Sequence, residues 1–252
     1  MWRAGRAGCF PPPATGVRIM ILIHEAMNRG HTDMGWLNSF HTFSFGGFQD
    51  PTRMGYAALR VINEDRIVPG SGFGEHAHSN MDILTIVLSG RLRHQDTLGN
   101  VTTMAPGEIQ LMSAGSGIRH SEMNASDKDP AHFLQIWLIP DSSGGAPGYQ
   151  QAPLPESETA QHWTLIAGGP AAGAPLRLNS DSRVLIAAAR EGTRTDVPVR
   201  PGRKTFLQVI EGLAEVDGER LGAGDGVQIG DEAMGDLAWI TQGRALLFDM
   251  RG

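Results

Sequence analysis

The feature that most constrains this chain is the regular interruption of short apolar runs by glycine and proline. Its 252 residues contain 33 glycines and 15 prolines, which fall mostly in short clusters between apolar stretches. Such clusters mark tight turns, and alternating or β-branched runs between turns indicate strands. The pattern therefore predicts an all-β protein built from many short strands.

The strand-like segments fall into two sets with a similar plan. The first set comprises Ala57–Asn63, Ile83–Leu88, Gly107–Met112 and His132–Ile139. The second set comprises Val184–Arg190, Thr205–Ile210, Ala214–Val216, Val227–Ile229 and Ala245–Met250. Between residues 54 and 140 no stretch has the spacing of a long amphipathic helix. In the second set, Asp217-Gly218 predicts a tight hairpin turn.

A segment rich in Ser, Gly, Pro and Gln, Asp141–Glu158, separates the two sets and is the best candidate for a linker. VLSGRLRHQDTLGN, residues 87–100, also aligns loosely with VIEGLAEVDGE, residues 209–219. The chain length suits two compact domains. We therefore expect two tandem barrel or sandwich domains, residues 20–152 and residues 153–252.

The first nineteen residues have a different character. They contain three arginines and a proline triplet, and they lack any hydrophobic periodicity. This composition predicts a disordered tail, or an upstream segment with the true start at Met20 or Met27. A targeting peptide is the weaker alternative, because both an apolar core and an amphipathic helical pattern are missing.

Charge, hydropathy and cysteine content exclude several classes of protein. The net charge is −6, and the nineteen arginines and two lysines form no basic block, so nucleic acid is not an expected partner. The longest early apolar run, Ile19–Ile23, is too short for a membrane span, so no membrane partner is expected. A single cysteine, Cys9, excludes an intrachain disulfide and a cysteine-based zinc site. A reducing, cytoplasmic location fits this content.

Two pairs of potential metal ligands stand out in the first half of the chain. His76 and His78 follow the glycine-rich turn GSG and are one residue apart, while His120 and Glu122 follow AGSG with the same spacing. In a strand, residues i and i+2 point to the same face, so each pair would project into one cavity. Three imidazoles and one carboxylate on neighbouring strands suit a divalent first-row metal and leave coordination positions open.

Simpler interpretations exist for each of these residues. A lone HxH pair is commonly accidental, and Glu122 alone would fit a solvated charge. The remaining histidines in the sequence lack clustered partners, and we expect surface or structural roles for them. They are His24, His31, His132 and His162, together with His41 in SFHTFSF and His94 in RLRHQD, whose surroundings are richer.

The residues around both pairs resemble two motifs of the cupin family. The first is G-x5-H-x-H-x3-D from Gly70 to Asp82, with Asp where cupins usually have Glu. The second is G-x5-S-x-G-x4-H-x3-N from Gly107 to Asn124, with Ser for the usual Pro and two extra residues before the histidine. These departures, together with HTFSFGGFQDPTRMGYAALRVINEDRI at residues 41–67, resemble the pirin family and particularly its bacterial members.

The resemblance implies a bicupin, that is, two tandem jelly-roll β-barrels. It also implies that His76, His78, His120 and Glu122 are the metal ligands and that Asp82 has a supporting role, either structural or in orienting an imidazole. In pirins the C-terminal domain, here residues 153–252, lacks a metal site. The sequence agrees independently, because His162 is the only histidine beyond Pro153 and no cysteine follows it.

The activity implied by the resemblance is that of a quercetin 2,3-dioxygenase. This reaction opens the central ring of a flavonol with O2 and releases carbon monoxide. The expected cofactor is one divalent transition metal, Fe(II) first, with Mn, Ni, Co or Cu as alternatives and Zn as a metal that purification can leave in place. Glu122 is then both ligand and proton acceptor. Candidate side chains for a flat cleft are Phe43, Phe45, Phe48, Phe73, Met112 and Ile118.

Two other functions fit the same residues. A non-enzymatic pirin would use the metal as a redox-sensitive element for binding a protein partner involved in transcription. A cupin isomerase or hydrolase is the third class, because fold does not fix function. We rank the dioxygenase first and expect a monomer or a weak homodimer. The native metal and the physiological substrate do not follow from the sequence.

Overall fold

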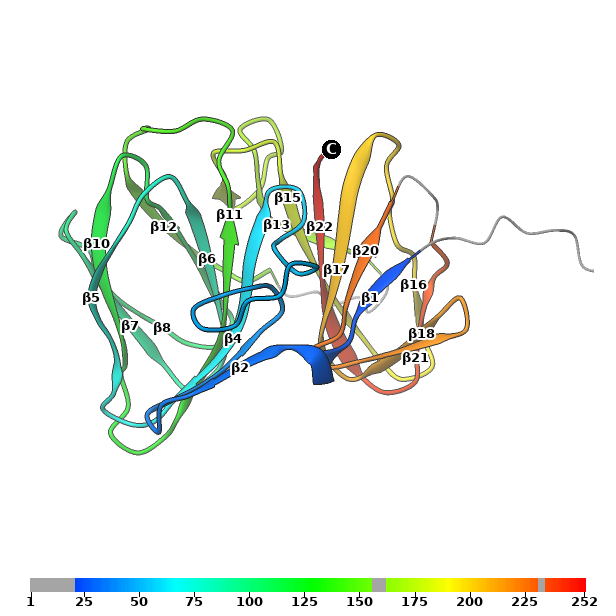
Figure 1. Ribbon diagram of the computed structural model, residues 1–252, viewed down its shortest axis with the longest axis horizontal. Helices are drawn as coiled ribbons and strands as arrows, with labels where there is room; N and C mark the ends of the chain where they lie inside the picture. The colour runs from blue at the N-terminus through cyan, green and yellow to red at the C-terminus, as the bar shows by residue number, and fades with distance from the viewer. Residues whose placement is uncertain (1–20, 156–161, 231–233) are drawn as a thin grey trace, which may run out of the picture.

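The computed structural model describes residues 21–155, 162–230 and 234–252. Within these ranges the chain forms two β-barrels that lie next to each other (Figure 1). The predicted all-β, two-barrel architecture is therefore confirmed. The tail predicted for residues 1–19 lies outside the described residues.

The first barrel is built from a seven-stranded and a four-stranded antiparallel sheet. The seven-stranded sheet contains, in spatial order, β12 (Gly148–Pro153), β9 (Glu108–Ser113), β6 (Asp82–Ser89), β11 (Ala131–Leu138), β4 (Leu59–Ile67), β3 (Leu37–His41) and β2 (Gly30–Asp33). The four-stranded sheet contains β5 (Gly72–His78), β10 (Ile118–Asn124), β7 (Leu92–Asp96) and β8 (Val101–Met104).

The second barrel repeats this construction. Its seven-stranded sheet contains β1 (Leu22–His24), β20 (Gly226–Ile229), β17 (Arg203–Glu211), β22 (Gly243–Arg251), β15 (Arg183–Ala189), β13 (Thr164–Gly168) and β14 (Leu176–Arg177). Its four-stranded sheet contains β16 (Arg194–Thr195), β21 (Leu237–Trp239), β18 (Leu213–Val216) and β19 (Glu219–Gly222). Between β18 and β19, Asp217 and Gly218 both have positive φ, of 50° and 86°, which confirms the predicted tight hairpin.

The two seven-stranded sheets pack against each other, and their shared core explains the long apolar runs in the sequence. On β11, Leu134, Ile136 and Leu138 belong to the same buried cluster as Ile186, Phe206 and Phe248 of the second barrel. The alternate residues of β11, Phe133, Gln135 and Trp137, point to the interior of the first barrel. A strand that is buried on both faces lacks a polar face, and so its sequence is almost continuously apolar.

Two details differ from the sequence prediction. The predicted linker Asp141–Glu158 contains strand β12, which pairs with β9 along its full length, so that part of the prediction is wrong. Polar residues are tolerated there because β12 lies at the edge of its sheet. The predicted strand Ala57–Asn63 begins later and extends through the polar residues up to Ile67, because Asn63 and Asp65 face the barrel interior.

The first strand of the described residues belongs to the second barrel, although the strands that follow it build the first. Strand β1 pairs with β20 of the second barrel, and the 3-10 turn η1 (Ala26–Asn28) then leads the chain back to β2 (Figure 1). Asp225 of the second barrel accepts a hydrogen bond from the backbone N–H of Ala26 at 2.6 Å. The division of the chain into two domains between residues 152 and 153 remains a proposal. Residues 22–24 precede that boundary but are part of the seven-stranded sheet of the second barrel.

Candidate metal centre

Strand β5 carries the first pair of predicted ligands into the barrel. The centroids of the His76 and His78 rings are 4.8 Å apart, so the i and i+2 positions do project together, as predicted. The turn that precedes the strand needs glycine at position 70, where φ is +68°. Gly72 at the start of the strand leaves no room for a Cβ, which would lie 2.2 Å from the carbonyl oxygen of Glu122. Glycine therefore allows β5 to approach β10 closely.

Strand β10 carries the second pair and lies antiparallel to β5. His120 is opposite His76 in the register, but Glu122 is opposite Phe73, so a β-bulge lies between the two positions. Bulges of this kind are common beside functional sites because they redirect side chains. The rings of His120 and His76 have centroids 4.5 Å apart, and those of His120 and His78 are 5.0 Å apart. The three predicted imidazoles thus form one cluster.

The potential ligand atoms of the first barrel form two groups that share His120. In the described residues, one group contains His76, His78 and His120, and the other contains His94, His120 and Glu122, with all ligand atoms of a group within 4.8 Å of each other. No comparable group occurs in the described part of the second barrel. The structure therefore brings the three histidines together and places Glu122 beside His120.

The tautomer of His76 follows from its neighbour in β5. Nδ1 of His76 lies 2.8 Å from the backbone carbonyl oxygen of Gly74. A carbonyl oxygen only accepts hydrogen bonds, so Nδ1 donates, and in the neutral ring the lone pair is on Nε2. Nε2 is thus the atom of His76 that is free to bind a metal.

A chain of buried polar groups sets the tautomer of His120 in the same way. Nε2 of His94 lies 3.0 Å from Oδ2 of Asp96 and donates to that carboxylate. Nδ1 of His94 can then only accept, and it lies 3.4 Å from the side-chain amide nitrogen of Gln110 and 3.5 Å from Nδ1 of His120. A hydrogen on Nδ1 of neutral His120 makes the second contact favourable and leaves the lone pair on Nε2. The sequence pattern missed this role of His94, since it has no i+2 histidine partner.

These tautomers provide a direct test of whether a metal fits. Nε2 of His120 faces Nε2 of His76 at 3.1 Å, so two lone pairs point at each other. Burial, with the charge of neighbouring imidazoles as a smaller cause, lowers the pKa of His120 to about 2 and that of His78 to about 4. Both rings are therefore neutral at pH 7, which is the form that binds metals. A shared cation would remove the repulsion, and so the donor set fits a metal ion.

Glu122 adds a carboxylate that also suits a cation. Its side chain is buried, and burial raises its pKa to about 8, although a hydrogen bond from Gln135 opposes this effect. The side-chain amide of Gln135 donates to Oε2, while Oε1 is buried and without a hydrogen-bond partner. A buried carboxylate oxygen without a partner is costly, and a nearby cation would offset that cost.

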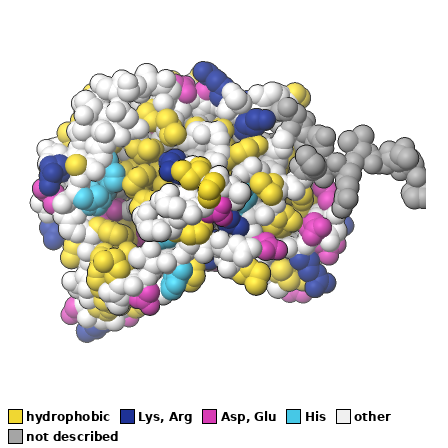
Figure 2. All heavy atoms as spheres, in the orientation of Figure 1, with side chains coloured by type: hydrophobic (Ala, Val, Ile, Leu, Met, Phe, Trp, Pro, Cys, Tyr) yellow, Lys and Arg dark blue, Asp and Glu magenta, His cyan; other side chains and the backbone are white. Residues whose placement is uncertain are grey.

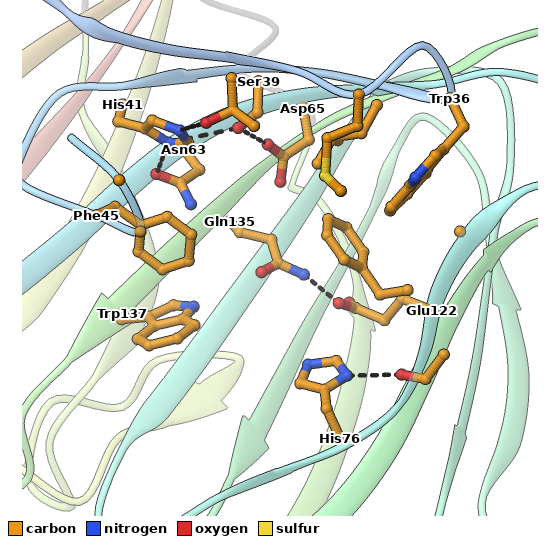
Figure 3. Close-up of a pocket in the computed structure, with 18 of the residues that line it drawn as sticks. Trp36, Ser39, His41, Phe45, Asn63, Asp65, His76, Glu122, Gln135 and Trp137 are labelled. Atoms are coloured by element: carbon orange, nitrogen blue, oxygen red, sulfur yellow. Dashed lines mark hydrogen bonds between the residues drawn. The ribbon is translucent and has the colours of Figure 1, made fainter.

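The cluster lies in a cavity of about 460 Å³ that also has aromatic walls. The walls include Phe45 and Trp137, whose rings are 5.4 Å apart, and Trp36 and Phe73, whose rings are 5.3 Å apart. Figure 3 shows the labelled residues around this cavity. In Figure 2 histidine side chains reach the surface of the first barrel beside hydrophobic ones. The volume and lining are typical of a site for a small aromatic molecule.

Several predicted residues lie elsewhere. Of the candidates for the cleft, Phe45 and Phe73 line the cavity, but Phe43, Met112 and Ile118 are buried in core clusters instead. Phe48 is also absent from the lining and packs against Gly30. Trp36 and Trp137 line the cavity instead, and no periodic pattern in the sequence indicates this role for them. Trp36, Phe43 and Phe48 lie in the segments before and after β3, outside the strands, so strand alternation does not determine which of them faces the cavity.

Asp82 has a structural role. Its Oδ2 accepts a hydrogen bond from the backbone N–H of Asn179 at 2.6 Å, and its Oδ1 accepts one from the Asn179 side-chain amide at 2.9 Å. Asn179 belongs to the second half of the chain, so Asp82 joins the two barrels. It therefore does not orient an imidazole, and the structural one of the two predicted alternatives holds.

Two tandem β-barrels with a histidine cluster inside the first define the bicupin class. A family model described as "Pirin" matches residues 23–138, and one described as "Quercetinase C-terminal cupin domain" matches residues 165–250. The chain therefore belongs to the pirin family.

Several relatives match nearly the whole chain. Quercetin 2,3-dioxygenase of Escherichia coli is 38% identical over 231 residues, which cover 92% of this chain and 99% of the relative. A pirin-like protein of Caulobacter vibrioides is 40% identical over 87% of this chain and 95% of its own length. The crystal structure of the bacterial pirin YhhW from E. coli in complex with nickel(II) matches with a TM-score of 0.86, 38% identity and coverage of 92% and 99%.

Among the described residues, no helix has the length and hydropathy needed to cross a membrane.

Proposed function

We propose that this protein is a metal-dependent dioxygenase that opens the central ring of a flavonol such as quercetin with O2 and releases carbon monoxide. The observation that carries the proposal is the cluster of His76, His78 and His120 in a cavity with aromatic walls. The E. coli relative named quercetin 2,3-dioxygenase supports it, because it is similar over 92% of this chain.

In this proposal His76, His78, His120 and Glu122 hold one divalent metal, through Nε2 of His76 and of His120. We propose iron(II) as the metal, with manganese, nickel, cobalt and copper as alternatives that the same ligands accept. The nickel(II) complex of the E. coli pirin supports a first-row metal in this family fold. The metal supplies Lewis acidity toward a phenolic oxygen and, for redox-active ions, electron transfer with O2.

The side chains of the cavity position the substrate and its proton. A bound metal cation would favour the ionised form of Glu122, and Oε1, which has no hydrogen-bond partner, is then the atom placed to accept the hydroxyl proton of a flavonol. Gln135 holds the other oxygen, Oε2, and thereby fixes the direction of Oε1. The rings of Phe45, Trp137, Trp36 and Phe73 provide flat apolar surfaces on which an aromatic substrate can stack.

Metal reconstitution tests the proposal. The protein is purified anaerobically, its metal content is measured, and apoprotein is loaded in turn with iron, manganese, nickel, cobalt, copper and zinc. Oxygen uptake is then followed with quercetin as substrate. We expect turnover with at least one of the redox-active ions and none with zinc, which lacks redox chemistry. Absence of turnover with all five other metals would refute the proposed function.

A further inference from the structure

A second group of polar side chains lines the same cavity on the opposite sheet. Ser39 and His41 on β3, and Asn63 and Asp65 on β4, are all at most 3% exposed, and all four line the cavity. We call these four residues the polar wall. The interior of a β-barrel is normally apolar, and buried polar groups that lack partners cost free energy. A polar wall at this place therefore needs an explanation.

Hydrogen bonds within the wall use only part of its capacity. Nδ1 of His41 lies 2.8 Å from Oδ1 of Asn63 and donates to it, and the hydroxyl of Ser39 donates to Oδ1 of Asp65. His41 also bonds Thr32 at 2.9 Å through Nε2. In the described structure, the amide nitrogen of Asn63 and Oδ2 of Asp65 have no such bond. The wall thus offers a free donor and a free acceptor.

Asn63 and Asp65 line the cavity on the side opposite the histidine cluster. Figure 3 shows Asn63 and Asp65 on one side and His76 on the other, with Gln135 and Glu122 between them. The topology agrees, because the wall is on the seven-stranded sheet and His76 is on the four-stranded sheet. A ligand in this cavity therefore has the histidine cluster on one side and the polar wall on the other.

We propose that Asn63 and Asp65 form a subsite that binds hydroxyl groups on the distal ring of a polyhydroxylated aromatic substrate. This inference rests on the proposed function and adds the feature by which the enzyme would select its substrate, namely the hydroxyl groups on the distal ring. A phenolic hydroxyl both donates and accepts, so it matches the Asp65 oxygen and the Asn63 amide. A flavonol that lacks hydroxyls on its pendant ring leaves both groups unpaired, and sites built in this way reject such analogues.

The test compares quercetin, which has two hydroxyls on its pendant ring, with galangin, which has none. Binding of each to the metal-loaded protein is measured by calorimetry without oxygen, and kcat/KM is measured with oxygen. We expect the wild-type protein to bind quercetin about tenfold or more tightly than galangin. In Asp65→Leu and in Asn63→Leu we expect this ratio to fall toward one, because quercetin loses a hydrogen-bond partner and galangin no longer leaves a buried polar group unpaired.

The matched control is Arg66→Leu, which changes a neighbour on the same strand whose side chain is 44% exposed. It should keep the wild-type ratio. Thermal unfolding shows whether each variant is folded. If neither leucine variant folds, the ratio of quercetin affinity to galangin affinity in the wild-type protein is the test of the subsite. Equal loss for both flavonols, or no discrimination by the wild-type protein, would overturn the subsite. If the wild-type protein binds quercetin more tightly than galangin but turns over neither, the subsite proposal stands and the proposed dioxygenase function is refuted.

Discussion

The side-chain amide of Gln135 donates a hydrogen bond to Oε2 of Glu122 across the interior of the first barrel, and Oε1 of Glu122 has no hydrogen-bond partner. The two residues come from different sheets, β11 and β10. A glutamate held by one oxygen presents the other in a fixed direction. This arrangement leaves Oε1 as the oxygen available to a metal ion or to a substrate proton, and the next variant tests proton acceptance.

Glu122→Gln should reduce turnover of quercetin more than it reduces metal content. The glutamine has nearly the same shape, and the Gln135 amide can rotate to offer its carbonyl oxygen to it. The substitution removes a proton acceptor, an effect that is typically 10²–10⁴-fold for general base catalysis. The measurements are kcat for quercetin and the metal-to-protein ratio. Unchanged kcat in the metal-loaded variant would show that Glu122 is not the base.

His76→Ala should deplete the metal while the protein stays folded. The side chain is at the cavity, and the apolar core that the two barrels share contains none of the residues that line the cavity. Metal analysis and thermal unfolding give the two readouts. His31→Ala, at an exposed histidine outside the cavity, is the control and should keep the metal. Loss of folding in His76→Ala would argue for a structural metal site.

Asp96→Asn should weaken metal binding without a direct contact between residue 96 and the ligand atoms. Oδ1 of Asp96 holds the turn through Leu98 and Asn100, which asparagine can also do. An amide N–H in place of Oδ2 would reverse the hydrogen bond to His94 and hence the tautomer of His120. Loss of such supporting bonds typically lowers metal affinity 10–100-fold. Competition with a chelator measures the affinity, and an unchanged value would contradict this role.

Glu64 should contribute stability that is lost in acid. Burial alone raises its pKa, but the hydrogen bond from His132 and the guanidinium of Arg29 outweigh this and lower the pKa from 4.5 to about 2. The folded value is below the unfolded one, so the stabilisation is complete above pH 4.5 and disappears as the pH falls toward 2. It amounts to about 3 kcal/mol at most.

Chemical denaturation of the wild-type protein and Glu64→Gln over this pH range tests the contribution. The wild-type protein should be more stable above pH 4.5, and the difference should shrink as the pH falls. A difference that is constant from pH 5 to pH 3 would mean that Glu64 keeps its ordinary pKa.

Much of this molecule could be predicted from the sequence because its signals are local. Strand β11 is an almost continuous apolar run, and the spacing of His76 and His78 fixes their common face. The functions of His94 and Asp96 could not be predicted, since their partner His120 is on another strand. The wall residues Asn63 and Asp65 were likewise hidden, because polar residues at the end of a strand usually indicate exposure. Strand register and β-bulges determine which side chains face the cavity and meet across strands, and both depend on tertiary packing.

The most direct test of the proposed chemistry is a turnover experiment in ¹⁸O2 with quercetin and the metal-loaded protein. Gas analysis measures carbon monoxide, and mass spectrometry measures the label in the organic product. We predict one carbon monoxide per quercetin consumed, without label, and two labelled oxygen atoms in the product. Absence of carbon monoxide, or a product with one labelled oxygen or none, would contradict ring opening by a dioxygenase at this site.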